Sequence, residues 1–230
     1  MIEDAVSYPF EGDEGLKRLA IGGLLILLSI FIVPIFLVIG YLVAVLRETL
    51  QGSTEPPAYD DWGALFVDGL TAFVIGLVYG LVPLAIFGVV AFGFLGAGAA
   101  AGGNGGGIIA GFGLLSLLLL IPVYVVVYYI TPAALANFAR EGRLGAAFDF
   151  TTLGNVVTSG DYVVAALVAI GISLVANVAT TLLAATVVGL VVVPFVSFYV
   201  QVATFRLFGS AFAKATDTER TAEQHATAGY

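Results

Sequence analysis

Cysteine is absent from this chain of 230 residues, and histidine occurs only once, as His225 near the end of the sequence. Structural zinc sites and iron–sulfur clusters need several cysteine or histidine ligands, so the composition excludes them. An intramembrane hydrolase would need a base beside its nucleophile, and the long apolar blocks contain no histidine or lysine. We therefore expect no metal, no cofactor, no catalytic residues and no enzymatic activity.

Charge is also scarce, at 10% of the residues against roughly 25% in an ordinary soluble domain. Hydrophobic residues make up 60% of the chain, and the mean hydropathy is +1.07. Three blocks contain no charged residue at all, namely 19–46, 69–139 and 162–205. A membrane-spanning helix needs about 20 apolar residues, so the blocks have room for one, two or three, and two spans respectively. The sequence predicts an all-α, polytopic integral membrane helical bundle.

Glycine and proline divide these blocks into about five spans. The glycine-rich stretch 96–107 should interrupt the middle block as a flexible external loop, because glycine disfavours a lipid-exposed helix. Pro122 should kink the following span, which we expect to leave the membrane near Thr131, and 184–189 should form a tight turn. The predicted spans lie near 19–46, 69–95, 108–131, 162–184 and 188–206.

The two ends of the chain are polar and flank this bundle, which we place at 19–213. Residues 1–18 form an acidic N-terminal segment, and 214–230 form a polar tail. With five spans, six of the eight basic residues fall on one side, which the positive-inside rule assigns to the cytoplasm together with the C-terminus. In an alternative, the first block folds back at Pro34 and places the N-terminus in the cytoplasm as well.

The charged connections suggest a duplicated unit of span, Arg-Glu, loop, Asp and span. Asp68 follows Arg47 by 21 residues, and Asp161 follows Arg140 by the same distance. Both units would run in the same direction, unlike the inverted repeats of many transporters. Coincidence is the alternative. We expect each aspartate to pair with an arginine at the cytoplasmic boundary, either within its own unit or across to the other unit. The alternative is independent solvation of these charges. The candidate charges are Arg47, Glu48, Asp68, Arg140, Glu141 and Asp161.

Two pairs of glycines have the small-xxx-small spacing that lets helices approach closely in lipid. They are Gly76 with Gly80, and Gly107 with Gly111. One interpretation makes them the seam of a dimer. The other makes them packing sites inside a single bundle.

The first third of the chain also contains a distinctive order of glycine, proline, aromatic and charged residues. This order consists of Gly22-Gly23, Pro34, Gly40-Tyr41, Arg47, Gly52, Pro56-Pro57, Trp62, Leu65-Phe66 and Asp68-Gly69. It resembles the domain-of-unknown-function family 4013, an uncharacterised prokaryotic membrane family common in halophilic archaea. The resemblance covers about residues 12–213 and supports a multi-pass protein, but it supplies no catalytic residues.

The chain has 16 acidic and eight basic residues and a pI near 4.4, a balance that fits an organism living in high salt. Together with the resemblance, it implies a halophilic archaeal source. The alternative is a merely acidic protein. We expect a non-enzymatic, multi-pass protein of the plasma membrane. It would act as a structural or accessory subunit, or as a bundle that binds a lipid or a small molecule. The alternative is an uncoupled channel or facilitator for a small solute. Membrane lipid is the expected partner, with self-association or other membrane subunits as further partners and no nucleic acid.

Overall fold

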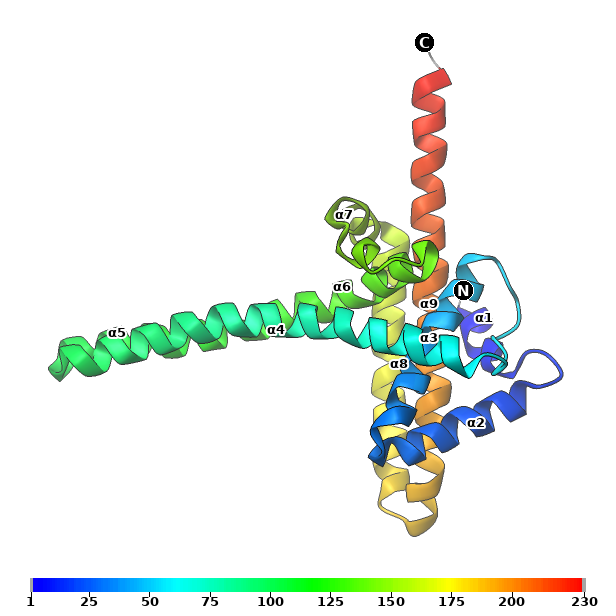
Figure 1. The fold of residues 1–230 in the computed structure, drawn as a ribbon, viewed down its shortest axis with the longest axis horizontal. Helices are drawn as coiled ribbons and strands as arrows, with labels where there is room; N and C mark the ends of the chain where they lie inside the picture. Colours follow the sequence, from blue (N-terminus) through cyan, green and yellow to red (C-terminus); the bar gives the residue numbers. More distant parts are fainter. Residues whose placement is uncertain (1, 229–230) are drawn as a thin grey trace. The chain divides into compact units, whose positions relative to one another are not determined.

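The computed structural model describes the backbone of residues 2–228 and the side chains of residues 2–218. This part of the chain is helical and contains no strand, which confirms the all-α prediction. Five of its helical segments are long and apolar enough to cross a membrane. The elements are α1 (Ile2–Ser7), η1 (Tyr8–Phe10), α2 (Gly15–Leu27), η2 (Leu28–Ile30), α3 (Ile32–Leu50), α4 (Trp62–Ala101), α5 (Gly103–Leu118), α6 (Leu120–Glu141), η3 (Leu144–Phe148), α7 (Phe150–Thr158), α8 (Gly160–Ala184) and α9 (Val187–Ala228), shown in Figure 1.

The chain divides into two compact units, which we describe separately. The main unit comprises residues 2–73 and 132–228, and the hairpin unit comprises residues 74–131. Helices α4 and α6 each begin in one unit and end in the other.

The first apolar block is two helices, so the prediction of one continuous span over 19–46 is wrong. Helix α2 ends at Leu27, and the short 3₁₀ turn η2 leads to Phe31, whose backbone is extended (ψ 137°). Helix α3 then starts at Ile32, with Pro34 in its first turn, where a proline costs no intrahelical hydrogen bond. The break lies a few residues before the Pro34 fold of the alternative prediction.

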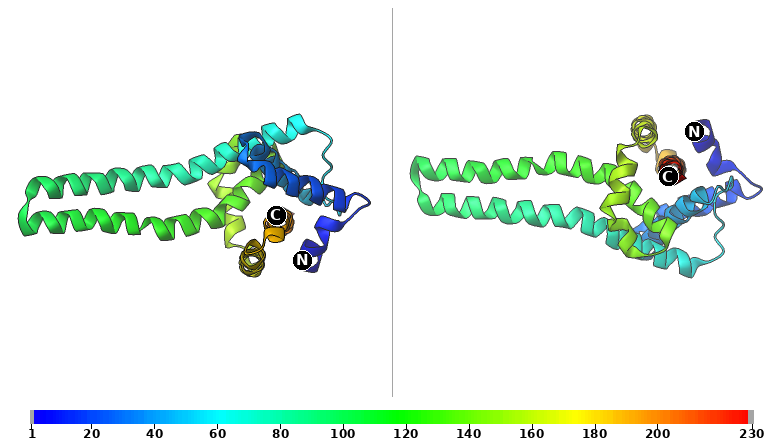
Figure 2. Two further views of the ribbon diagram at one scale, coloured as in Figure 1. Left: turned by 90° about the horizontal axis from the view of Figure 1, so that it is seen from below. Right: turned by 90° about the horizontal axis from the view of Figure 1, so that it is seen from above.

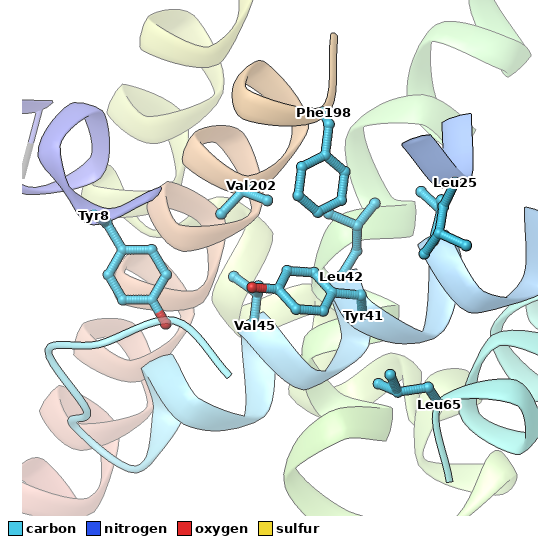
Figure 3. Close-up of a cluster of buried hydrophobic side chains, with 9 residues drawn as sticks. Tyr8, Leu25, Tyr41, Leu42, Val45, Leu65, Phe198 and Val202 are labelled. Atoms are coloured by element: carbon cyan, nitrogen blue, oxygen red, sulfur yellow. The ribbon is translucent and has the colours of Figure 1, made fainter. Parts of the chain in front are cut away.

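Helix α9 is the centre of the main unit and packs against α1, α2, α3 and α8. Its Phe198 and Val202 lie in a buried cluster with Leu25 of α2 and Tyr41 of α3 (Figure 3). Two glycines of α2 face this helix: a Cβ at Gly22 would overlap the Phe198 ring, and one at Gly23 would overlap the Phe195 ring. Small residues on α2 therefore set how closely it approaches α9.

Helix α3 also lies very close to the start of α4. A Cβ at Gly40 would collide with the carbonyl oxygen of Leu65, and one at Gly69 would collide with that of Phe36. The two backbones are therefore in direct contact through glycine on both sides. Within the same unit, α8 and α9 run antiparallel and meet at a turn of Ala185 and Thr186, inside the predicted stretch 184–189.

The hairpin unit corrects one further expectation. The glycine-rich stretch 96–107 is not a loop, because α4 continues to Ala101 and α5 begins at Gly103. Only Gly102 and Gly103 form the turn, with φ of +62° and +57°, values that glycine adopts without steric cost. Figure 2 shows the two arms of this hairpin side by side up to the turn.

Two chain segments also stay helical beyond their expected ends. Helix α6 continues through Pro132 to Glu141, past the point near Thr131 where the span is predicted to leave the membrane, and Pro122 lies in its first turn. The backbone of α9 continues through most of the predicted polar tail to Ala228. His225 lies in the part of the tail whose side chains are outside the described residues.

Candidate binding site beside the N-terminal segment

Arg206 of α9 holds the N-terminal segment against the rest of the main unit. Its Nε and Nη2 donate hydrogen bonds to the two carboxylate oxygens of Asp4, at 3.1 and 3.3 Å. Its Nη1 donates to the carbonyl oxygen of Ser53 at 2.7 Å, and the guanidinium carbon lies 4.3 Å from the centre of the Tyr8 ring. The Arg206 side chain is only 9% exposed. Such a two-pronged charged pair has well-defined geometry, so it holds α1 at a fixed position on α9.

Two tyrosines extend this attachment. The Tyr8 hydroxyl donates to the carbonyl oxygen of Glu55 at 3.0 Å, and the Tyr199 hydroxyl of α9 donates to that of Val6 at 2.8 Å. Burial raises the pKa of Tyr8 to about 12, even though the nearby Arg206 acts in the opposite direction. Tyr8 therefore stays protonated at neutral pH and keeps its hydrogen bond.

Next to this attachment, three aromatic rings form a row. The Tyr41 ring stacks on Tyr59 with 4.4 Å between the centroids, and Tyr59 stacks on Trp62 at 5.3 Å. The Tyr59 hydroxyl oxygen is buried and has no hydrogen-bond partner among the described residues. Burial raises the pKa of this hydroxyl well above its usual value, so it remains a neutral donor.

The outer end of this aromatic row opens into a cavity of about 250 Å³. Two carboxylates, two basic side chains and two aromatic rings contribute to its wall, so the charges at the site balance. The lining residues are Glu14, Lys17, Arg18, Ile21, Tyr59, Asp60 and Trp62.

Arg18 brings to this cavity a buried hydrogen-bond donor without a partner in the described part of the chain. Its Nε is buried without a partner among the described residues, and the whole side chain is only 12% exposed. Its two other contacts are long: Nη1 lies 3.4 Å from the Glu11 carbonyl oxygen, and Nη2 lies 3.9 Å from a Glu55 carboxylate oxygen. A buried donor without an acceptor is costly, so this guanidinium is poised to take an anionic oxygen.

Lys17 lines the same cavity, but unlike Arg18 it is exposed and has a close ion-pair partner. Its Nζ lies 2.7 Å from the Glu14 carboxylate, and this hydrogen bond lowers the pKa of Glu14. Both side chains are largely exposed, so the pair is a surface ion pair of little energetic weight. Lys17 therefore provides a matched control for Arg18.

The predicted pair of arginine and aspartate forms in the first repeat unit but not in the second. In the first, Arg47 Nη1 lies 2.9 Å from Asp68 Oδ2, while Glu48 forms no ion pair among the described residues. In the second, Arg140 does not meet Asp161 and instead lies 3.1 Å from the neighbouring Glu141. The second unit is therefore not a copy of the first at this position.

Arg140 also contacts an aromatic ring. Its guanidinium carbon lies 5.3 Å from the centre of the Phe212 ring of α9. The other Glu141 oxygen is taken by Arg143, so Glu141 joins two arginines. Asp161 lies in the first turn of α8, where a negative charge favours the helix N-terminus, and it forms no ion pair among the described residues.

The predicted packing glycines have open space beside them in the described chain. A Cβ at Gly76, Gly80, Gly107 or Gly111 would meet no atom within 4 Å, although the Gly80 carbonyl oxygen accepts a hydrogen bond from Tyr124 of the facing arm. Their role as packing sites or as a dimer seam therefore stays a prediction. Other glycines bring the arms of the hairpin unit together. A Cβ at Gly98 would lie 2.6 Å from the Gly106 carbonyl oxygen, and one at Gly113 would lie 2.8 Å from that of Ala91. Which glycines lie between the arms depends on the helix face that meets the partner arm, and the spacing of glycines in the sequence does not reveal this face.

Several residues of the site were not singled out by their sequence pattern. Asp4 and Tyr8 lie in an acidic segment with no periodicity, and Arg18 counted only as a boundary charge. A signal was nevertheless present, because Arg206 ends a charge-free block and needs a nearby acid once it is partly buried. In the described part of the chain, no three acidic or imidazole side chains come together as a metal site.

A comparison with protein families matches residues 23–185 to the family described as "Protein of unknown function (DUF4013)". Comparisons with curated proteins and with solved structures gave no match. The matched part includes Tyr59, Trp62 and the Arg47–Asp68 pair, whereas Arg18 and Arg206 lie outside it. Because the match covers well over half of the chain, the protein belongs to the DUF4013 family of proteins of unknown function.

Proposed function

We propose that this multi-pass membrane protein is a non-enzymatic binding protein that holds a lipid headgroup or a small polar molecule in the cavity beside Arg18. The observation that carries the proposal is the buried Nε of Arg18, which faces no acceptor among the described residues. A phosphate or carboxylate supplies two oxygens in the plane of the guanidinium, which is the geometry that arginine binds best.

The remaining lining residues favour a ligand that also carries a positive or apolar group. Tyr59 is stacked between Tyr41 and Trp62, so the ring at the end of the row, Trp62, is the one that can attract a cation or hydrocarbon. The carboxylates of Glu14 and Asp60 lie on the same wall. Tyrosine, tryptophan, lysine and arginine are also typical of the level of the lipid headgroups. A zwitterion satisfies all of these groups, either as a phospholipid headgroup or as a free solute.

A retention experiment tests this proposal. The protein is purified in mild detergent from cells and in parallel after exchange into a zwitterionic phospholipid, and bound lipid is quantified by mass spectrometry. We expect about one phospholipid per chain, a large loss in Arg18→Gln, partial retention in Arg18→Lys, and full retention in Lys17→Gln. Equal retention in Arg18→Gln and Lys17→Gln would overturn the headgroup assignment.

A second arm separates a free solute from a lipid, and binding from permeation. If lipid is not retained, binding of a free zwitterion such as glycine betaine is measured by calorimetry with the same variants. Solute and ion flux into proteoliposomes tests the uncoupled channel or facilitator, and co-purification of another membrane protein tests the accessory subunit. Rapid flux that Arg18→Gln leaves unchanged would contradict a binding role at this cavity.

The proposal also includes an orientation for the chain. From the excess of basic residues near Arg47, Arg140 and Arg206, we place these boundaries and the C-terminus in the cytoplasm of a plasma-membrane protein. Single cysteines at Glu55, Asn104 and Glu219 test this with an impermeant maleimide on intact cells. We expect labelling at Asn104 only, and labelling at Glu55 alone would reverse the orientation.

A further inference from the structure

The geometry points to a re-entrant hairpin at the start of the chain: α2 enters the membrane, the apolar tip 28–33 ends within the hydrocarbon, and α3 returns to the same surface. The N-terminus and the C-terminus consequently lie on one side of the membrane. This inference does not rest on the proposed binding site. It assigns the tip to one partner, the acyl chains of the surrounding lipid.

The first support comes from the ties of the N-terminal segment. Asp4 is bound by Arg206, and Arg206 also binds the carbonyl oxygen of Ser53, in the connection between α3 and α4. Tyr8 reaches the carbonyl oxygen of Glu55 in that same connection. The segment before α2 and the segment after α3 therefore lie beside each other, which a single crossing by α2 and α3 together would not allow.

The α8–α9 pair gives the main unit a depth scale. Its apolar part lies between the turn at Ala185 and the charged level of Arg206, and the stretch from Val187 to Arg206 measures about 28 Å at 1.5 Å per residue. This length matches the hydrocarbon thickness of about 30 Å. Position along α9 can therefore be read as depth below the charged surface.

On this scale, α2 meets α9 close to the middle of the membrane. Gly22 lies against Phe198 and Gly23 against Phe195, which are 8 and 11 residues from Arg206. These positions correspond to depths of about 12 and 16 Å. Figure 1 shows α2 lying across α9 instead of along it, so α2 does not continue directly to the opposite surface.

The length of α3 limits how deep the tip can reach. From Phe31 to Arg47 the helix measures at most about 24 Å, and any tilt makes its depth smaller. The tip is therefore unable to cross a core of about 30 Å. Its large side chains are unusually exposed, with Ile30 at 86%, Phe31 at 65% and Ile32 at 71%. Exposure of this kind is unfavourable in water and favourable among acyl chains.

The backbone at the tip is compatible with this environment. Polar backbone groups without partners are costly in hydrocarbon, so a break at this depth must leave few of them. The Phe31 N–H donates to the Leu28 carbonyl oxygen at 2.9 Å, and Ser29 Oγ donates to that of Leu25 at 2.9 Å. Pro34 has no N–H and thereby removes one of the four unpaired donors at the start of α3.

The arrangement also explains the distribution of basic residues. Lys17 and Arg18, which a single crossing would place alone on the opposite side, join the other six on one surface. Arg140, although distant in sequence, reaches that surface through the Phe212 ring beyond Arg206 on α9. All eight lysines and arginines then obey the positive-inside rule.

Two single-cysteine probes test the inference, since the chain has no native cysteine. Ser7→Cys and the same-side control Glu55→Cys are labelled with an impermeant maleimide in intact and in permeabilised cells, with Asn104→Cys as the opposite-side control. We expect the cysteines at Ser7 and Glu55 to be labelled from the same side of the membrane, and the cysteine at Asn104 to be labelled from the other side. Labelling of Ser7 together with Asn104 would overturn the inference.

A depth measurement then examines the tip itself. A nitroxide at Ile30, chosen because this side chain is so exposed, is compared in lipid vesicles with one at the exposed Gln51. We expect the Ile30 label to be relaxed mainly by oxygen, and the Gln51 label mainly by a water-soluble nickel chelate. If the chelate relaxes Ile30 as strongly as Gln51, the tip is in water and the re-entrant hairpin is wrong.

Discussion

The main unit and the hairpin unit are both built from apolar helices, yet they are held together in different ways. In α3, half of the most apolar stretch is buried inside the protein, whereas the corresponding values are 6% in α4 and 11% over Gly103–Glu141. The main unit contains buried aromatic rings and a charged attachment through Arg206. The hairpin unit relies on close backbone approach at Gly98, Gly106 and Gly113.

This difference shows that hydropathy indicates where helices cross a membrane but not what they pack against. In lipid, two apolar helices gain little from burying each other, so association depends on small residues and on polar contacts. The main unit has both kinds of contact. The hairpin unit has mainly small residues where its arms meet, together with a hydrogen bond from the Tyr124 hydroxyl to the Gly80 carbonyl oxygen at 2.8 Å.

The largest effect should come from glycine in the main unit. Gly40→Ala places a Cβ against the Leu65 carbonyl oxygen, which forces α3 and α4 apart and should cost about 3 kcal/mol. Gly76→Ala meets open space and serves as the control, with a change within about 0.5 kcal/mol. Unfolding in detergent measures both. Equal stability of the two variants would remove the contrast between packed and unpacked glycines.

Removal of the charged attachment should come next. Arg206→Met deletes three charge-assisted hydrogen bonds and should destabilise the main unit by about 2–3 kcal/mol. Limited proteolysis should then cut within residues 2–14 faster than in the unmodified protein. Lys214→Met, at an exposed position of the same helix, is the control. Unchanged proteolysis in Arg206→Met would show that the segment is held by its tyrosines alone.

Glycine in the hairpin unit should matter less. Gly98→Ala brings a Cβ to 2.6 Å from the Gly106 carbonyl oxygen, but the apolar stretches of the arms are only 6% and 11% buried, so the arms can separate slightly. We expect a loss of about 1–2 kcal/mol, against a change within about 0.5 kcal/mol in Gly105→Ala, where the space is open. Titration with a denaturing detergent compares them. A loss as large as that of Gly40→Ala would mean that both units are equally tightly packed.

The buried Tyr8 predicts a stability change in alkali. Its pKa is about 12 in the folded protein and about 10 when unfolded, so above pH 10 only the unfolded state releases the proton. Stability should therefore fall as the pH rises past 10, by about 1 kcal/mol at pH 10.5. Thermal unfolding from pH 8 to 10.5 measures the decline, and Tyr8→Phe should reduce its slope. A parallel decline in Tyr8→Phe would assign the effect to other groups.

The smallest effect is expected from the ion pair of Arg47 and Asp68. The pair is partly exposed, so exchanging its charges should change stability by only about 0–1 kcal/mol. Arg47→Asp and Asp68→Arg are measured singly and together, and the double variant should recover what the single variants lose. The combination of Arg47→Asp with Asp161→Arg is the control and should show no recovery. Recovery in this control alone would place the pairing between the two repeat units.

Features of the chain that depend on local composition could be predicted from the sequence. Long charge-free blocks indicate apolar helices because charges are costly in hydrocarbon, and the turn at Ala185 and Thr186 lies in the expected stretch. The break at Phe31 is less visible, since the residues around it are as apolar as a helix interior. The glycine-rich stretch 96–107 looked like a loop because glycine has low helix propensity, but small residues allow the two arms to approach closely.

The candidate site could be predicted only in part, because it joins residues that are far apart in the sequence. Arg47 and Asp68 occupy the two ends of one connection, so their meeting follows from a simple hairpin. The pairing of Asp4 with Arg206 depends on the folding back of α2 and α3, which no single residue signals. The cavity beside Arg18 depends on that same event, since its other wall comes from the connection before α4.

The attachment of Asp4 to Arg206 also has a consequence for biosynthesis. The two residues are separated by 202 positions, so the N-terminal segment emerges from the ribosome long before its partner exists. At roughly 5–20 residues per second, it waits about 10–40 seconds for α9 to be made. Docking of this segment is therefore a late assembly step, and protection of residues 2–14 from protease during a pulse-chase experiment would report when insertion of the last helix is complete.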